Sequence, residues 1–429
     1  MGMFDNCLDL KEIKFNNNTS TKNLEDMNYM FRGCVSLEYI DTKIFKENQV
    51  RDLSSAFENC YALKEIDLSY FETKYIQKLE NTFKKCKSLS KINLAHFDTS
   101  KVTTMAHMFQ ECYSLTSLDL SYFNLEKLKD SNSMFYKCDK LKEIIFNNNT
   151  LAKNLKDKND MFTGCKSLEK INTKIFRESN FTDLNYFFKD CHSLKEIDLS
   201  YFKSKYITGL EGTFYNCKSL IKINLTNFDF SEVKTINNLF YGCLNLKSIN
   251  ISIINTSNLI NAAFAFSNCK SLENINLPDQ LIALKSTENM FENCIKLTSI
   301  NLGFLQGNYK LNITRGMFKG CSSLIEITFP SLEVEKISDA SEMFMGCTNL
   351  TSVNLEELIV KHMDFMESTF YDCKSLIYLN IKNLETKYVQ SFDNIFEGIE
   401  KKLKVIYDRG ITGTDLQLEI NKNKNLSAE

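Results

Sequence analysis

Hydrophobic side chains recur along this chain with a period of about 26 residues. In the segment "CYALKEIDLSYFETKYIQKLENTFKKC" (60–86), leucines and isoleucines begin each unit on an L-x-x-L-x-L spacing. Ile66 and Leu68 alternate there with polar neighbours such as Glu65, and a period of two is typical of a half-buried strand. The end of the unit, "ENTFKKC" (80–86), contains good helix formers and predicts one helical turn before the next strand.

The cysteines fix the register of this repeat. Of the fourteen intervals between the fifteen cysteines, ten are 26 residues, three are 27 and one is 25. A phenylalanine stands three residues before every cysteine, from Phe4 to Phe370, and a leucine stands three residues after every one. A sixteenth unit keeps the frame at Phe396 but has Ile399 in the cysteine position. The chain therefore contains about sixteen copies of one unit.

A longer period is superimposed on the short one. The string "FNNNT" occurs at 15–19 and again at 146–150, an offset of 131 residues or five repeats. The cysteines follow the same offset. We interpret this as a duplicated five-repeat block, about 7–137 and 138–268, followed by a third block that has diverged further.

A unit of this length is too short to bury its own apolar face, so neighbouring units must cover one another. The L-x-x-L-x-L spacing is that of a leucine-rich repeat. We predict an α/β repeat fold, a leucine-rich-repeat solenoid of about sixteen coils with one parallel β-sheet and short helical turns. The solenoid spans 1–399, and 400–429 breaks the frame and is expected to form a C-terminal cap and tail.

The repeat resembles that of the BspA-like leucine-rich-repeat family of surface proteins. The segments "MFQECYSLTSLDLSYF" (108–123), "MFTGCKSLEKINTKIF" (161–176) and "MFKGCSSLIEITFPSL" (317–332) carry the resemblance. So does "HFDTSKVTTMAHMFQEC" (96–112), and the match extends from residue 3 to about residue 399. The resemblance implies adhesion or the binding of host macromolecules, with a location at the cell surface or outside the cell.

Charge and hydropathy narrow the choice of partners. The 52 basic and 54 acidic side chains nearly balance, and no basic stripe of the kind that binds nucleic acid is present. No segment has the ~18 consecutive apolar residues of a membrane helix, so direct membrane insertion is not expected. The chain also shows no signal peptide or anchor, which makes a cytoplasmic location the alternative to the cell surface.

The sequence offers no pattern that predicts catalysis, a metal or a cofactor. All cysteines share one coil position, and side chains stacked about 4.8 Å apart lie wider than the roughly 3.8 Å between Cβ atoms in a disulfide. A straight row cannot surround zinc either, so we expect buried free thiols. The four histidines are scattered, and His96 takes a position held by tyrosine in other units. We therefore expect a protein that is not an enzyme.

One polar row is a candidate binding site. Aspartate or asparagine stands seven residues after the cysteine in twelve of the fifteen units, between the two inward strand positions. The row could serve hydrogen bonding between adjacent coils, or it could form a recognition strip for a protein or a glycan. Its members are Asp41, Asp67, Asn93, Asp119, Asn172, Asp198, Asn224, Asn250, Asn276, Asn301, Asn354 and Asn380.

The leading functional hypothesis is an interaction or adhesion module that binds host or neighbouring-cell macromolecules through its strand face. A cytosolic protein-interaction scaffold is the alternative, favoured by the missing signal and by the free thiols. Charge reversal at Asp67, Asp119 and Asp198 would test the polar row.

Overall fold

Each repeat forms one coil, and in most coils a strand of two to four residues follows the leucine of the repeat. The computed structural model describes residues 2–16, 19–252, 257–422 and 425–428. The chain divides into two units, the first made of Met1–Tyr206 and Ile223–Phe228 and the second of Ile207–Lys222 and Asp229–Glu429.

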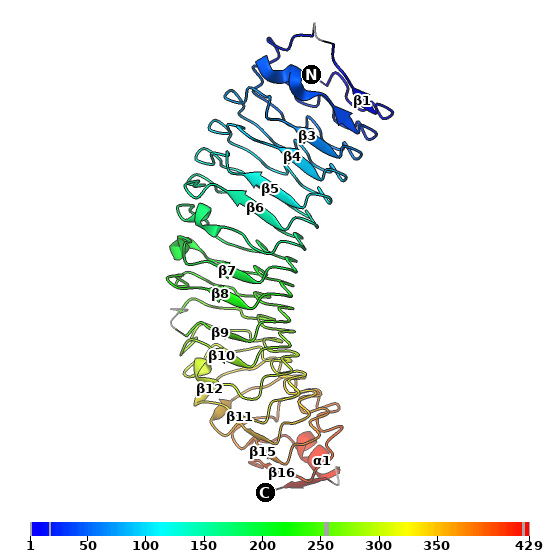
Figure 1. Cartoon of the computed structure of the whole chain (residues 1–429). Coiled ribbons are helices and arrows are strands. Elements are labelled where there is room, and N and C mark those ends of the chain that lie inside the picture. Colours follow the sequence, from blue (N-terminus) through cyan, green and yellow to red (C-terminus); the bar gives the residue numbers. More distant parts are fainter. Residues whose placement is uncertain (1, 17–18, 253–256, 423–424, 429) are drawn as a thin grey trace. The chain divides into compact units, whose positions relative to one another are not determined.

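The first unit stacks its coils so that neighbouring strands run parallel (Figure 1). Strands β1 and β2, β3 and β4, and β5 and β6 pair in register. The 3-10 helices η1, η2 and η3 lie between strands. The elements are β1 (Glu12–Ile13), β2 (Tyr39–Ile40), η1 (Thr42–Glu47), β3 (Glu65–Asp67), β4 (Lys91–Asn93), β5 (Ser117–Leu120), β6 (Glu143–Phe146), η2 (Thr173–Phe176), β7 (Glu196–Asp198) and η3 (Ser204–Tyr206).

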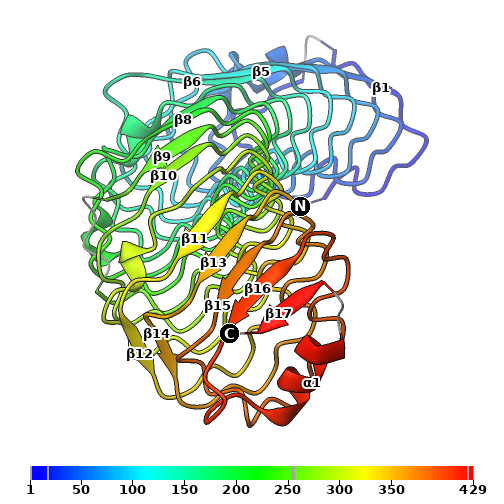
Figure 2. The same cartoon turned by 90° about the horizontal axis from the view of Figure 1, so that it is seen from below.

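The second unit follows the same plan and adds the C-terminal segment. Its strands form a ladder β11-β13-β15-β16-β17 and a separate parallel pair β12-β14, and α1 lies beside β17 (Figure 2). Strand β8 (Lys222–Asn224) spans the chain boundary between the units. The other elements are β9 (Ser248–Asn250), β10 (Asn274–Asn276), η4 (Gly303–Leu305), β11 (Glu326–Thr328), β12 (Leu332–Val334), β13 (Ser352–Asn354), β14 (Leu358–Val360), β15 (Tyr378–Asn380), β16 (Leu403–Ile406), α1 (Thr414–Lys422) and β17 (Leu426–Ala428).

The alternation read from the sequence is confirmed in the strands. Ile66 and Leu68 are buried while Glu65 is exposed. The fold is the expected leucine-rich-repeat solenoid of about sixteen coils. Its strand ladder is broken into short stretches, and one interruption has a clear cause. The buried hydroxyl of Thr42 donates a hydrogen bond to the carbonyl of Asp67, and the chain turns into η1 at that point.

The expected helical turn over residues 80–86 is wrong. This segment is a run of turns in which Asn81 and Lys85 have φ values of 56° and 60°, which excludes an α-helix. The backbone N–H of Asn81 donates to the carbonyl of Ala106 in the next coil (2.9 Å), and that of Lys85 donates to Gln110 (2.7 Å). A helix would use these N–H groups in hydrogen bonds within the segment. Here they instead bond to the next coil, so stacking between coils overrides the helix propensity of the residues.

The cysteine row forms a column through the core, as expected. Fourteen cysteines are buried and Cys7 is partly exposed, and all fifteen are free. In thirteen of them the thiol donates to a phenylalanine carbonyl of the preceding coil, as from Cys112 Sγ to Phe83 O at 3.1 Å. The phenylalanine rings beside them stack in turn, Phe83 on Phe109 with centroids 5.8 Å apart.

Candidate interaction surface

The polar row at the end of the strands is built into the backbone turns. In eleven of the twelve residues the side-chain Oδ1 accepts a hydrogen bond from the backbone N–H two residues later, as in Asp119 to Ser121 at 2.9 Å. This is an Asx turn, which bends the chain at the end of the strand. Asn276 is the exception, because Pro278 has no N–H to donate.

The residues of the polar row differ in their exposure to solvent. Asn380 is buried, and its amide nitrogen donates to Glu356 of the preceding coil (3.2 Å). The sequence left open a role in bonding between coils, and the structure shows that the main partner is instead within the same coil. The exposed members are Asp119, Asn250, Asn276 and Asn301, and the half-buried ones are Asp41, Asp67, Asn93, Asn172, Asp198, Asn224 and Asn354.

Two carboxyls of the row are electrostatically distinct. Burial by itself would raise the pKa of Asp67, but hydrogen bonds from the hydroxyl and N–H of Ser69 and from the amide of Asn93 outweigh it and lower the pKa. The pKa of Asp198 is lowered in the same way, against its burial, by Ser200 and Asn224. Hydrogen bonding thus favours the charged form at both positions.

The exposed side chains of the strands form a more accessible surface. A groove of about 460 Å³ lies over β2, β3 and β4, lined among others by Tyr39, Glu65, Asp67, Tyr70 and Lys91. Tyr39 is 44% exposed, and Glu65 and Lys91 come from adjacent coils in register. The groove combines exposed aromatic rings with charges of both signs.

An aromatic row that the sequence analysis did not assign to a site lies beside the strands. Tyr70, His96 and Tyr122 occupy the same position in three consecutive coils and are exposed. The rings of His96 and Tyr122 have centroids 5.0 Å apart. The recurrence of an aromatic residue ten positions after the cysteine was the available signal, and His96 lies on the surface like the tyrosines at this position.

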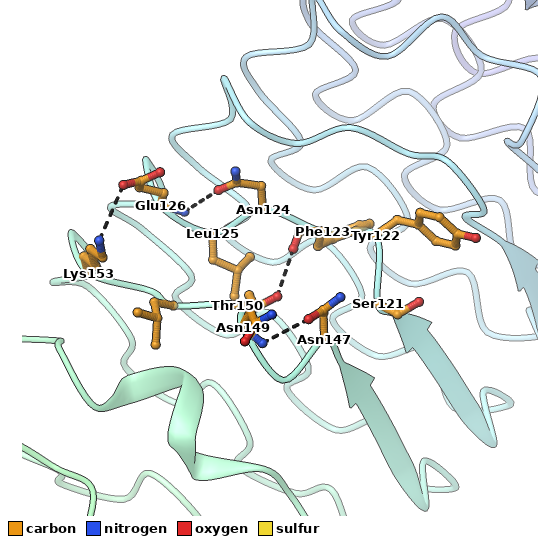
Figure 3. A pocket seen from close by; sticks show the side chains of 11 residues that line it. Ser121, Tyr122, Phe123, Asn124, Leu125, Glu126, Asn147, Asn149, Thr150 and Lys153 are labelled. Atoms are coloured by element: carbon orange, nitrogen blue, oxygen red, sulfur yellow. Dashed lines mark hydrogen bonds and ion pairs between the residues drawn. The ribbon is translucent and has the colours of Figure 1, made fainter.

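A second hollow, of about 370 Å³, adjoins this row. It lies between the turns 121–126 and 147–153, with Tyr122 at one end and the Glu126–Lys153 ion pair at the other (Figure 3). Most of the remaining lining side chains are amides and hydroxyls, including Asn124 and Asn147.

No cluster of three or more potential metal ligands occurs in the part of the chain that the structure describes. Within those same residues, no helix has the length and hydrophobicity needed to cross a membrane.

Two models of protein families match different parts of the chain. Residues 1–95 and 51–176 match the model described as "Mycoplasma protein of unknown function, DUF285". Residues 234–376 and 311–412 match the "BspA type Leucine rich repeat region (6 copies)". A search of curated proteins found no significant match.

Several solved leucine-rich-repeat proteins match this chain at low sequence identity. A Bacteroides ovatus leucine-rich repeat protein is 18% identical, covers 95% of this chain and 86% of its own, and has a TM-score of 0.45. A leucine rich cell surface protein of Faecalibacterium prausnitzii is 15% identical over 76% and 75%, with a TM-score of 0.35. The plant peptide hormone receptor RGFR1, solved with RGF2, is 14% identical over 96% and 72%, with a TM-score of 0.28. Together with its own repeat, these matches identify the chain as a leucine-rich-repeat protein whose residues 234–412 are of the BspA type.

Proposed function

We propose that the chain is a non-enzymatic interaction or adhesion module that binds a protein partner through the strand face of its first unit. The observation that carries the proposal is the groove over β2, β3 and β4. Its backbone repeats from coil to coil. At the same strand position, however, three successive coils carry an aromatic, an acidic and a basic side chain, those of Tyr39, Glu65 and Lys91. A fixed frame with variable exposed side chains supports specific recognition.

The chemistry of the groove fits a protein surface. Tyrosine supplies a large contact area at low entropic cost and is common among the residues that dominate binding energy. Glu65 and Lys91 can pair with opposite charges on a partner and set its orientation. The Asp67 carboxylate takes part in its own turn, so it contributes charge while its Oδ1 is already bonded.

Photocrosslinking would test this proposal. A photoreactive amino acid at Glu65 is expected to capture a defined protein from extracts of the source cells or their environment, which mass spectrometry would identify. The same group at Lys85, in the turn before Cys86, serves as the control. Capture of the same proteins at both positions, or of none at Glu65, would contradict a specific strand-face site.

Measuring the affinity of the captured partner provides a second test of the proposed site. Glu65→Lys combined with Lys91→Glu should weaken binding by tenfold or more, roughly the effect of losing one well-placed charge pair. Lys85→Glu is a matched control, because Glu111 occupies the same turn position one coil later with a similar φ of 59°. The exposed residues Glu65 and Lys91 are better targets than the aspartates of the polar row, because charge reversal at Asp67, Asp119 or Asp198 would also disturb a turn.

For location, we propose display at the cell surface, supported by the resemblance to BspA-type repeats. The alternative, a cytosolic scaffold, is favoured by fourteen buried unpaired thiols. Protease shaving of intact source cells separates the two. Peptides of this chain released without a cytosolic control protein support surface display, and their appearance only after lysis supports the scaffold.

A further inference from the structure

The hollow beside Tyr122 lies where a regular column of rings stops. The position eleven residues after the cysteine holds phenylalanine in successive coils, and Phe97 stacks on Phe123 with centroids 5.8 Å apart. In the next coil this position is Asn149, whose side chain is exposed. The ring column therefore ends at Phe123, and the hollow of about 370 Å³ lies next to it, between 121–126 and 147–153 (Figure 3).

Two asparagine amides in the hollow have their oxygens bonded and their nitrogens available. Asn124 Oδ1 accepts from the N–H of Glu126, and Asn147 Oδ1 accepts from the N–H of Asn149, both at 2.9 Å. Among the described residues, no atom accepts a hydrogen bond from the amide nitrogen of Asn124 or of Asn147. Each turn thus orients an NH₂ group with two donors toward an external ligand or water.

An aromatic surface borders these donors. Tyr122 is 50% exposed, and the ring of His96 lies 5.0 Å from it at an interplanar angle of 56°. An exposed ring of this kind offers a flat apolar face together with a hydroxyl. A ligand that uses both features must have an apolar face and several hydroxyl groups on its edge.

The charges in the hollow cancel. Glu126 and Lys153, its two charged lining residues, form an ion pair at 3.6 Å. The lining thus holds no unpaired cation that would select a uronic, sialic or sulfated sugar. An open hollow walled by amides and hydroxyls also differs from the desolvated apolar pockets at the centre of protein interfaces.

We propose that this hollow binds a neutral oligosaccharide. One sugar ring stacks on Tyr122, and its hydroxyls accept hydrogen bonds from the amide nitrogens of Asn124 and Asn147. The site goes beyond the proposed protein-binding function, because the hollow shares no lining residue with the groove over β2, β3 and β4.

Saturation-transfer NMR of the full chain with soluble sugars tests this proposal. The probes are cellohexaose, maltohexaose and the hexamer of N-acetylglucosamine, with a hyaluronan fragment as the charged comparison. At least one neutral probe is expected to show transfer, and its affinity should fall about tenfold or more in Tyr122→Ala. No transfer to any neutral probe, or transfer to hyaluronan alone, would overturn the proposal.

Matched variants separate recognition from folding. Asn124→Asp with Asn147→Asp keeps the two Oδ acceptors of the turns, removes the amide donors and adds two negative charges, so about a tenfold loss of affinity for a neutral probe is expected with the fold retained. Tyr201→Ala is the control, since Tyr201 holds the position of Tyr70 in the duplicated block and is 36% exposed. Binding that is lost equally in Tyr201→Ala, or retained in the double aspartate variant, would refute the assignment.

The two proposals fail independently. Glu65→Lys with Lys91→Glu should leave sugar binding unchanged, because neither residue lines the hollow. Loss of sugar binding in that variant would contradict a separate site. Failure of the sugar test leaves the photocrosslinking test at Glu65 unaffected.

Discussion

At the residue scale, the structure explains why one position is cysteine in fifteen successive coils. The side chain must be small, apolar enough for the core and able to donate one weak hydrogen bond to the phenylalanine carbonyl behind it, as Cys112 does to Phe83. A thiol meets these three conditions. Burial also raises the pKa of the thiols, that of Cys34 to about 11 and that of Cys373 to about 12.

These raised pKa values predict a sharp pattern of thiol labelling. At pH 8 the thiolate of a buried cysteine is scarce and shielded, so a maleimide reagent should modify Cys7 quickly and the other fourteen slowly. Denatured protein should reveal fifteen reactive thiols. Mass spectrometry of labelled peptides over time measures both rates. Rapid labelling of Cys112 or its neighbours in native protein would contradict the packing of the column.

The lowered pKa values of Asp67 and Asp198 predict a dependence of stability on pH. Each carboxyl stabilises the fold above its unfolded pKa of about 3.9, and this contribution is lost as the pH falls through the lower folded value. The effect should be about 1 kcal/mol or less for each, because both groups are partly exposed. Asp67→Asn with Asp198→Asn keeps the turns and should flatten the fall in unfolding free energy as the pH drops below about 4.

Urea unfolding at several pH values supplies the measurement for this pair. Asp119→Asn is a suitable comparison, since Asp119 accepts a hydrogen bond from the Ser121 N–H in the same way but is exposed. An equal flattening in Asp119→Asn would show that the two half-buried carboxyls have no special role.

Residue patterns also determine how much of this molecule could be predicted. The period, the inward positions and the buried thiols follow from spacing alone, because each coil has to present the same apolar side chains to its neighbours. The sequence left open whether the side chain of Asp67 bonds to a neighbouring coil or to a backbone N–H of its own coil. That choice depends on the geometry of the turn, in which Asp67 accepts from the N–H of Ser69. The hollow was missed because it lies where Asn149 stands between two coils that have phenylalanine at this position, Phe123 and Phe176.

At the scale of the element, one coil departs from the plan. Lys158 occupies a core position and is only 3% exposed. Its ammonium lies 3.2 Å from Asp183 and over the rings of Phe181 and Phe187, at 5.3 and 5.9 Å from their centroids. The equivalent position in the first block, 131 residues earlier, is Met27.

The residues around this lysine are larger than their counterparts in the first block. Phe181 corresponds to Val50, and Phe187 corresponds to Ala56. The larger rings give the buried ammonium two aromatic faces, a favourable arrangement for a cation that has left water. The coil thus compensates a charged core residue with packing from the coil that follows.

This coil predicts opposite effects for the two members of its ion pair. Lys158→Met should leave the unfolding free energy unchanged or raise it by about 1–4 kcal/mol, as when a buried pair gives way to an apolar side chain of similar volume. Asp183→Ala should lower it by about 1–3 kcal/mol, less than for a fully buried pair because Asp183 is partly exposed. Chemical denaturation measures both. A stabilised Asp183→Ala variant would contradict this account.

At the scale of the whole molecule, a solenoid of this kind is stable only if its terminal coil is covered. In the second unit, Leu403 and Val405 of β16 are fully buried. The C-terminal segment supplies part of the cover, with Leu416 of α1 fully buried and Ile420 nearly so. We propose on this basis that residues 400–429 act as the cap.

The cap proposal gives the final prediction. Leu416→Ala should lower the unfolding free energy by about 2–5 kcal/mol, the usual effect of removing a buried leucine side chain. The loss should be greatest near the end of the stack, because coils contact only their neighbours, so amide exchange in β15 and β16 should rise more than exchange in β9. Leu418→Ala is the matched control, since Leu418 lies in the same helix and is 52% exposed. Equal exchange in the two variants would show that α1 is attached to the solenoid without stabilising it.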